Sequence, residues 1–201
     1  MFVSFEGLDG SGKTTQADLL AESLGKEDRK VVTTREPGGT PLGEQVRELL
    51  LHGEDMAPWT EAALFTAARA ELVERVIGPS LAGGADVISD RFLDSSLVYQ
   101  GVARGLGIER VLALNLDAIR GILPDVTFLL LVDVDEAVKR SAEARDRIER
   151  QGDGFMTIVD NGYRQLAGLF PQRIVAIQGG RPVHDIAKEV REHVRQRAGT
   201  S

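Results

Sequence analysis

The residues with the clearest chemical meaning lie near the start of the chain, where positions 7–14 read Gly-Leu-Asp-Gly-Ser-Gly-Lys-Thr. This is the spacing G-x-x-x-x-G-K-T, in which glycines let consecutive backbone N–H groups converge on one phosphate. Lys13 is expected to reach the β- and γ-phosphates of a nucleotide, and the Thr14 hydroxyl to bind Mg²⁺. The alternatives are a chance glycine-rich turn and a dinucleotide fingerprint, which would need its third glycine where Thr15 stands.

Arginines are the second chemical signal, because a planar guanidinium grips phosphate oxygens in pairs and stays charged. Arg35 and Arg91 each follow an expected strand. Three more arginines lie in a charged stretch interrupted by glycines, which we expect to be a lid at about residues 143–154. The lid candidates are Arg145, Arg147 and Arg150. The alternative for any one of them is a surface charge paired with a neighbouring carboxylate.

Asp90 precedes Arg91 at the end of a short apolar run. A carboxylate at the carboxyl end of a strand is well placed to organise Mg²⁺ or a phosphate-binding arginine. Aspartate also serves as a helix N-cap, and both roles are compatible.

Two residue pairs have the spacing of neighbours on one helical face. Phe65 and Arg69 are four apart and offer a flat ring beside a hydrogen-bonding fork. Ser96 and Gln100 are also four apart and offer polar groups that would suit the edge of a heterocyclic base. Each pair taken alone is more often part of a core or a surface than of a base pocket.

The elements that must position these residues alternate along the chain. Apolar runs expected to be strands cover residues 2–6, 30–34, 86–89, 126–132 and 173–177. Helical spacing covers residues 13–24, 42–51, 60–77, 108–119, 136–144, 154–170 and 184–197. Strands that are apolar on both faces, alternating with helices, indicate an α/β fold with a doubly wound parallel sheet of about five strands. In such a sheet, ligands bind beyond the carboxyl ends of the strands.

Composition narrows the class of protein. The length of 201 residues fits a single domain, and the formal net charge of −7 argues against a nucleic-acid partner. Cysteine is absent and the three histidines are scattered, so neither a disulfide framework nor a site built on thiolates or histidines is expected. We find no targeting segment and no apolar run long enough for a membrane span, and therefore expect a cytoplasmic protein with no membrane partner.

Taken together, these motifs resemble the thymidylate kinase family over nearly the full chain. The segments at 34–40 (Thr-Arg-Glu-Pro-Gly-Gly-Thr) and 90–101, which contains Asp-Arg-Phe and Tyr-Gln-Gly, are more specific than the phosphate loop. The segment 123–127 (Leu-Pro-Asp-Val-Thr) also fits. Some family members carry an arginine inside the phosphate loop, where this chain has Gly10. The chain therefore looks like the branch that places the catalytic cation on the lid.

The resemblance implies a P-loop kinase that transfers the γ-phosphoryl group of ATP to dTMP, with Mg²⁺, in dTTP synthesis. Lys13, Arg91 and the lid arginines would be catalytic, with Thr14 and Asp90 at the metal. It also implies a homodimer. The implied ATP-binding residues are Gly7, Leu8, Asp9, Gly10, Ser11, Gly12, Lys13, Thr14 and Thr15.

The resemblance also implies a dTMP site. Asp9 would accept a hydrogen bond from the 3′-hydroxyl, and Arg35 and Arg91 would hold the acceptor phosphate. Phe65 would stack on thymine while Arg69 donates to its O4. The remaining implied contacts are Ser96 and Gln100 at the base edge, Ser96 through a bridging water, and Tyr99 against a ribose 2′-hydroxyl.

Two other functions remain open from the residues. One is a kinase of the same fold that acts on another monophosphate, since uracil differs from thymine by one methyl group, worth about 1–3 kcal/mol. The other is a nucleotide-dependent switch without transferase activity. The sequence leaves open which lid arginine is catalytic, the adenine-binding residues and the isomer of the Glu36–Pro37 bond.

Overall fold

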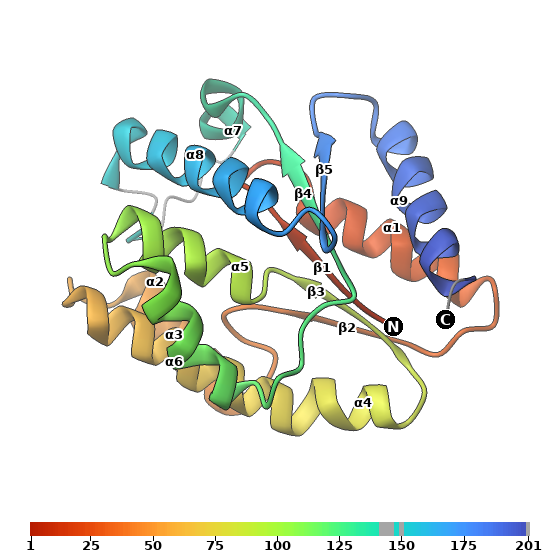
Figure 1. Cartoon of the computed structure of the whole chain (residues 1–201), viewed down its shortest axis with the longest axis horizontal. Coiled ribbons are helices and arrows are strands. Elements are labelled where there is room, and N and C mark those ends of the chain that lie inside the picture. The colour runs from red at the N-terminus through yellow and green to blue at the C-terminus, as the bar shows by residue number, and fades with distance from the viewer. Residues whose placement is uncertain (141–146, 149–150, 200–201) are drawn as a thin grey trace.

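The computed structural model describes residues 1–140, 147–148 and 151–199. A parallel five-stranded sheet with the order β2-β3-β1-β4-β5 lies at the centre (Figure 1). All five predicted strands are confirmed, with every boundary within one residue. The strands are β1 (Phe2–Glu6), β2 (Val31–Arg35), β3 (Asp86–Asp90), β4 (Val126–Leu131) and β5 (Ile174–Gln178).

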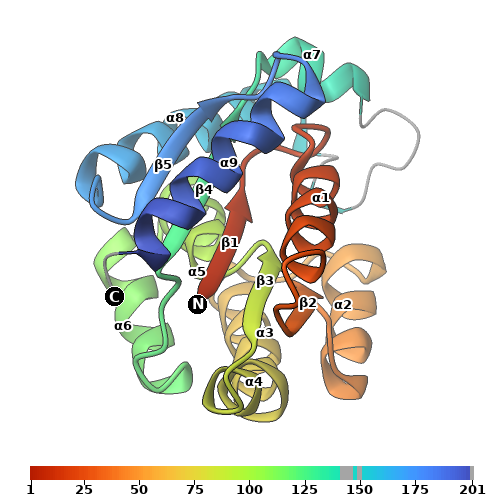
Figure 2. The ribbon, with the colours of Figure 1, turned by 90° about the vertical axis from the view of Figure 1, so that its right-hand side faces the viewer.

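Helices cover both faces of this sheet, as predicted. Helices α1 and α9 lie together on one face, and in Figure 2 they stand in front of the strands. The other face carries the remaining long helices. The helical elements are α1 (Lys13–Gly25), α2 (Pro41–His52), α3 (Pro58–Leu72), η1 (Val73–Ile77), α4 (Gly78–Ala82), α5 (Leu93–Ser96), η2 (Leu97–Ala103), α6 (Ile108–Ala118), α7 (Val134–Arg140), α8 (Asp153–Leu169) and α9 (Val183–Ala198).

Successive side chains of β1 point to opposite faces of the sheet and so belong to two separate parts of the core. Val3 and Phe5 belong to the apolar cluster beneath α1 and α9. Phe2 points to the other face and packs with Phe92, their rings 4.9 Å apart between centroids. Ser4 and Glu6 share that second face, where they are fully buried. The second face therefore holds a polar layer, which extends beneath the carboxyl end of the strand.

Within the described ranges, the sequence prediction missed one helix. Helix α5 continues directly into the π-helical segment η2, so residues 93–103 form one helical stretch. Most of this stretch is buried all round, so it lacks the apolar stripe that reveals a surface helix. It also contains Asp94, Ser95, Ser96 and Gly101, which have modest or poor helix propensity.

The parallel register gathers the predicted functional segments at one edge. Arg35 at the end of β2 is in register with Asp90 at the end of β3, which in turn is in register with Phe5 of β1. The phosphate loop follows β1 directly. The phosphate loop, Arg35 and Asp90 therefore meet at the carboxyl edge of the sheet, where ligands are expected to bind.

Candidate active site

A cavity of about 800 Å³ occupies this edge of the sheet. It is a single space that runs from the phosphate loop to α3 and η2. Its lining includes Asp9, Gly10, Gly12, Lys13, Thr14, Thr15, Arg35, Phe65, Asp90, Arg91, Ser95, Ser96, Tyr99, Gln100, Arg140 and Ile148.

The phosphate loop has a backbone that only glycine adopts easily. Gly7 has a φ of 137°, and a Cβ atom there would lie 2.5 Å from the carbonyl oxygen of Leu130. Gly12, immediately before α1, has a φ of 94°. These conformations turn the chain sharply from β1 into α1, so the positive end of the α1 dipole faces the cavity.

Lys13 is buried beneath this loop. Its ammonium group donates to the carbonyl oxygen of Leu8 at 2.8 Å and lies 3.5 Å from the Asp9 carboxylate. Burial, together with the nearby charge of Arg91, lowers the pKa of Lys13. A buried ammonium group is preorganised to stabilise an anion, because little water must be displaced from it when the anion binds.

Oxygen atoms suited to a hard cation meet beside Lys13. The Thr14 hydroxyl donates to a carboxylate oxygen of Asp90. The Ser11 hydroxyl, in the middle of the loop, is buried and has no hydrogen-bond partner in the described part of the chain. Within the described ranges no group of three or more His, Cys, Asp or Glu side chains forms a metal site. A cation here would therefore be held by one or two protein oxygens together with nucleotide phosphates, as is common for Mg²⁺.

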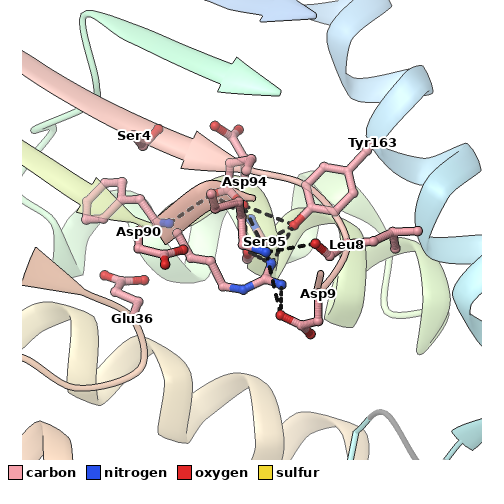
Figure 3. Close-up of polar contacts among 12 residues, drawn as sticks. Ser4, Leu8, Asp9, Glu36, Asp90, Asp94, Ser95 and Tyr163 are labelled. Carbon is pink, nitrogen blue, oxygen red and sulfur yellow. Dashed lines mark hydrogen bonds and ion pairs between the residues drawn. The ribbon is translucent and has the colours of Figure 1, made fainter. Parts of the chain in front are cut away.

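Arg91 is the central cation of the cavity. Its guanidinium donates to Asp9 at 2.7 Å and to the hydroxyls of Ser95 and Tyr163, both at 3.0 Å. Figure 3 shows Asp9, Ser95 and Tyr163 arriving at this point from three different elements. The backbone of Arg91 has a φ of 70°, an unusual value for a side chain of this size. A strained backbone held by so many contacts is typical of a functional position.

Glu6 lies directly behind this cluster. Its carboxylate accepts hydrogen bonds from the backbone N–H groups of Phe92 and Ser95, and from the Ser95 and Tyr163 hydroxyls. Burial and the charge of Asp94 raise the pKa of Glu6 to about 7. Glu6 thus fixes the two hydroxyls that contact Arg91.

The end of the cavity away from the phosphate loop, here called the base pocket, is lined by residues predicted to bind the nucleoside of the substrate. Phe65, Ser96 and Gln100, which were predicted to contact the base, line it together with Tyr99, which was predicted to lie near the 2′ position of the sugar. The Arg91 guanidinium carbon lies 5.5 Å from the centre of the Tyr99 ring, so the pocket connects directly to the central cation.

Arg69 lies in the wall behind that pocket and is only 1% exposed. Its guanidinium pairs with the buried carboxylate of Glu36 at 2.6 Å and donates to Asn115 and to the Ser96 hydroxyl. The Glu36–Pro37 bond, whose isomer the sequence left open, is cis. Arg69 thus joins the loop after β2 to the pocket-lining residue Ser96.

The other arginines predicted for the site differ in their positions relative to the cavity. Arg35 lines the cavity and is paired with Glu44 of α2 at 3.0 Å. Arg147 is buried and donates to the carboxylate of Glu61 at 2.7 Å and to the carbonyl oxygen of Leu50 at 2.9 Å. Arg145 and Arg150, like half of the predicted lid, lie outside the described residues. The catalytic role of the lid arginines therefore stays a prediction.

Several residues at the site were not singled out from the sequence. Glu6 carries a signal that could have revealed it, because it is a charge at the end of an otherwise apolar strand. Tyr163, Glu61 and Arg104 have no such local signal, since their partners are distant in sequence. Arg140 lines the cavity and donates to the carbonyl oxygen of Gly10 in the phosphate loop.

Comparison with known proteins agrees with the geometry. A family model described as thymidylate kinase matches residues 5–190. Among similar proteins, the thymidylate kinase of Caldanaerobacter subterraneus is 47% identical over 191 residues, covering 94% of this chain and 92% of the relative. That of Symbiobacterium thermophilum is 45% identical over 199 residues, covering 98% and 93%.

A solved structure is similar as well. The crystal structure of thymidylate kinase from Ehrlichia chaffeensis superposes with a TM-score of 0.80 at 36% identity, covering 97% of this chain and 98% of the other.

None of the helices in the described ranges has both the length and the apolar character needed to cross a membrane.

Proposed function

The chain belongs to the thymidylate kinase family, and from that premise we propose that its cavity holds ATP and dTMP end to end, with Lys13 and Arg91 at the junction of their phosphates. The enzyme phosphorylates dTMP to dTDP, and the family uses ATP as the donor. The observation that carries the proposal about the residues is the continuity of the cavity from the phosphate loop to the base pocket.

The reaction needs no nucleophile from the protein. A phosphate oxygen of dTMP attacks the γ-phosphorus of ATP, and the bond from that phosphorus to the bridging β–γ oxygen breaks, leaving ADP. The phosphate loop and Lys13 hold the donor phosphates, and Arg91 and Arg35 hold the acceptor phosphate. Both sets of cations neutralise charge that would otherwise keep two anions apart.

Asp9 has two tasks in this arrangement. Its carboxylate orients Arg91, from which it accepts a hydrogen bond at 2.7 Å. It also accepts a hydrogen bond from the 3′-hydroxyl of dTMP. Beyond the sugar, Phe65 stacks on thymine, Arg69 donates to O4, and Ser96 and Gln100 contact the base edge. Tyr99 packs where a ribose 2′-hydroxyl would lie and so disfavours ribonucleotides.

Mg²⁺ fits the oxygen atoms beside the phosphate loop. Thr14 and Asp90 would hold the ion, which when bound to ATP neutralises the β- and γ-phosphate oxygens. Thr14 and Asp90 already contact one another, so these two residues would present their oxygen atoms together.

A homodimer is supported by the apolar side chains left at the surface of three helices on one side of the sheet. Leu49 of α2, Trp59 of α3, and Leu114 and Leu116 of α6 are each more than a third exposed. Exposed apolar groups on neighbouring helices are typical of subunit interfaces. Replacing Leu114 with arginine should shift the protein to monomers in analytical ultracentrifugation, and an unchanged sedimentation coefficient would contradict the interface.

A cytoplasmic location of the protein stays a prediction.

The test of the proposed site is a comparison of monophosphates with matched variants. ADP release is measured with dTMP, dUMP, dCMP, dGMP or no acceptor, in the wild type and in Lys13→Met. The variant should lose at least about 100–1,000-fold in turnover while its circular dichroism spectrum and unfolding midpoint stay near those of the wild type. Unchanged turnover in a folded Lys13→Met protein would refute the assignment.

A further inference from the structure

The part of the molecule that the reaction leaves unexplained is a buried charged cluster at the floor of the base pocket. Its centre is Glu61 of α3, which is 1% exposed and does not line the cavity within the described residues. Among the residues that the structure describes, three side chains donate to it. They are Gln100 of η2, Arg104 immediately after η2, and Arg147.

The contacts of Glu61 determine the orientation of the Gln100 amide. Gln100 Nε2 donates to Glu61 Oε1 at 2.9 Å. An ionised carboxylate can only accept hydrogen bonds, so the end of the amide that faces Glu61 must be the NH₂ group. The carbonyl oxygen of Gln100 is then the end left for the cavity that this residue lines. Among the described residues, nothing donates to that oxygen.

The two arginines keep Glu61 ionised. Arg104 donates to both carboxylate oxygens, at 3.2 and 3.1 Å, and Arg147 donates to Oε2 at 2.7 Å. Burial alone would raise the pKa of Glu61, but the hydrogen bonds from Arg104, Gln100 and Arg147 outweigh it and hold the pKa below its usual value. A protonated Glu61 could donate to Gln100 and allow the Gln100 amide group to rotate by about 180°. The arginines prevent this rotation by keeping Glu61 ionised.

We infer that Glu61 is a positioning residue for base specificity, which fixes Gln100 so that it presents only an acceptor to the base. This rests on the proposed role of Gln100 at the base edge. A fixed acceptor suits the N3–H donor of thymine or uracil and opposes the bare N3 acceptor of cytosine. The identity of the base is thus read partly by a residue that does not touch it.

The decisive variant is Glu61→Gln, which is isosteric but carries a donor. Arg104 and Arg147 direct two hydrogen bonds at the Oε2 position, and Arg104 Nε directs one longer bond, of 3.2 Å, at Oε1. The introduced amide therefore places its oxygen at the Oε2 position and its NH₂ group toward Gln100. Gln100 must then turn its carbonyl oxygen to that NH₂ group and its own NH₂ group to the cavity. This removes the acceptor that thymine needs and offers a donor to cytosine.

The experiment compares dTMP with 5-methyl-dCMP, which keeps the methyl group and differs at N3 and at the 4-substituent. Dissociation constants are measured by calorimetry, and kcat and KM for dTMP are measured alongside. In Glu61→Gln we expect the binding preference for dTMP over 5-methyl-dCMP to fall at least about tenfold, because a buried hydrogen bond changes partner. KM for dTMP should rise, whereas kcat at saturating dTMP should change by less than about threefold.

Two controls separate positioning from general loosening. Arg104→Lys keeps a cation beside Glu61 and leaves the bond to Gln100, so its preference should stay within about twofold of the wild type. The double variant Glu61→Gln with Gln100→Glu returns one carboxylate and one amide to the cluster. The carboxylate introduced at position 100 can only accept, so the preference should return toward the wild-type value even if Glu61→Gln alone folds poorly.

The outcomes distinguish this inference from the proposed function. If Gln100→Ala leaves the preference unchanged, the proposed role of Gln100 at the base is wrong, and the inference with it. If Gln100→Ala lowers the preference but folded Glu61→Gln does not, only the inference is overturned. Equal weakening of both ligands in Glu61→Gln, or a double variant that regains no preference, would also overturn it.

Discussion

The pairing of Arg69 with Glu36 makes a sharp prediction about stability. Both side chains are nearly inaccessible, at 1% and 4% exposure, and their nearest charged atoms are 2.6 Å apart. Replacing Arg69 with methionine keeps most of the buried volume but leaves the Glu36 carboxylate without its cation. Breaking a buried ion pair on one side costs about 3–5 kcal/mol. We expect the free energy of unfolding to fall by this amount, a large fraction of the stability of an ordinary domain.

If the charge of Glu36 causes the loss of unfolding free energy in Arg69→Met, that loss must depend on pH. Burial raises the pKa of Glu36 above its usual value, although Arg69 opposes this shift. In Arg69→Met only the effect of burial remains, so the folded-state pKa rises further. The folded variant then binds a proton that its unfolded state releases, and its stability falls as pH rises above the unfolded pKa. The deficit relative to wild type should therefore be larger at pH 8 than at pH 5.5.

Urea unfolding followed by circular dichroism measures this, with common m-values confirming two-state behaviour. Adding Glu36→Gln to Arg69→Met should recover about 1–3 kcal/mol, because the stranded charge is removed. Arg75→Met is the matched control. Arg75 is 70% exposed beside Glu71, and its loss should cost less than about 1 kcal/mol. A deficit for Arg69→Met no larger than the control's, or one equal at both pH values, would refute the reasoning.

Three further predictions concern the site. With a folded pKa of about 7 against 4.5 when unfolded, Glu6 should cost the protein about 3 kcal/mol of stability as pH rises between those values, so Glu6→Gln should flatten the pH dependence of the urea midpoint there. A slope unchanged in the variant would show that another group titrates. Phe65→Ala should raise the KM for dTMP about 5- to 150-fold while that for ATP stays within about threefold. Equal effects on both would remove Phe65 from the base pocket. Thr14→Ala should raise the Mg²⁺ concentration for half-maximal activity about tenfold, measured by metal titration at fixed ATP, and no shift would contradict its role as a ligand.

The sequence predicted the parts of the fold that depend on local pattern. All five strands and the phosphate loop follow from apolar runs and glycine spacing, and the parallel arrangement follows from their alternation with helices. The buried helical stretch from Leu93 to Ala103 was missed because burial on all sides leaves no periodic signal.

Of the cations predicted for the site, Lys13, Arg35 and Arg91 line the cavity, but the carboxylates that pair with the predicted arginines could not be foreseen. Arg69 was interpreted as a base-binding residue and Arg147 as a catalytic residue, and in the structure each contacts a buried carboxylate that is far away in sequence. The distance along the chain is 33 positions for Arg69 and Glu36 and 86 for Arg147 and Glu61. No local pattern carries that information, because it arises only when the sheet brings the segments together.

The central place of β1 has a consequence for how the protein folds as it is synthesised. Met1 and Phe2, at its start, bond to Asp86 and Asp125, which lie 85 and 123 positions further along the chain. A growing polypeptide must therefore hold an apolar strand without either of its neighbours until a large part of the protein has left the ribosome. Such long-range pairing slows folding and produces partly folded intermediates whose exposed apolar surface promotes aggregation. We expect refolding at high protein concentration to lose yield to aggregation, and molecular chaperones to restore it.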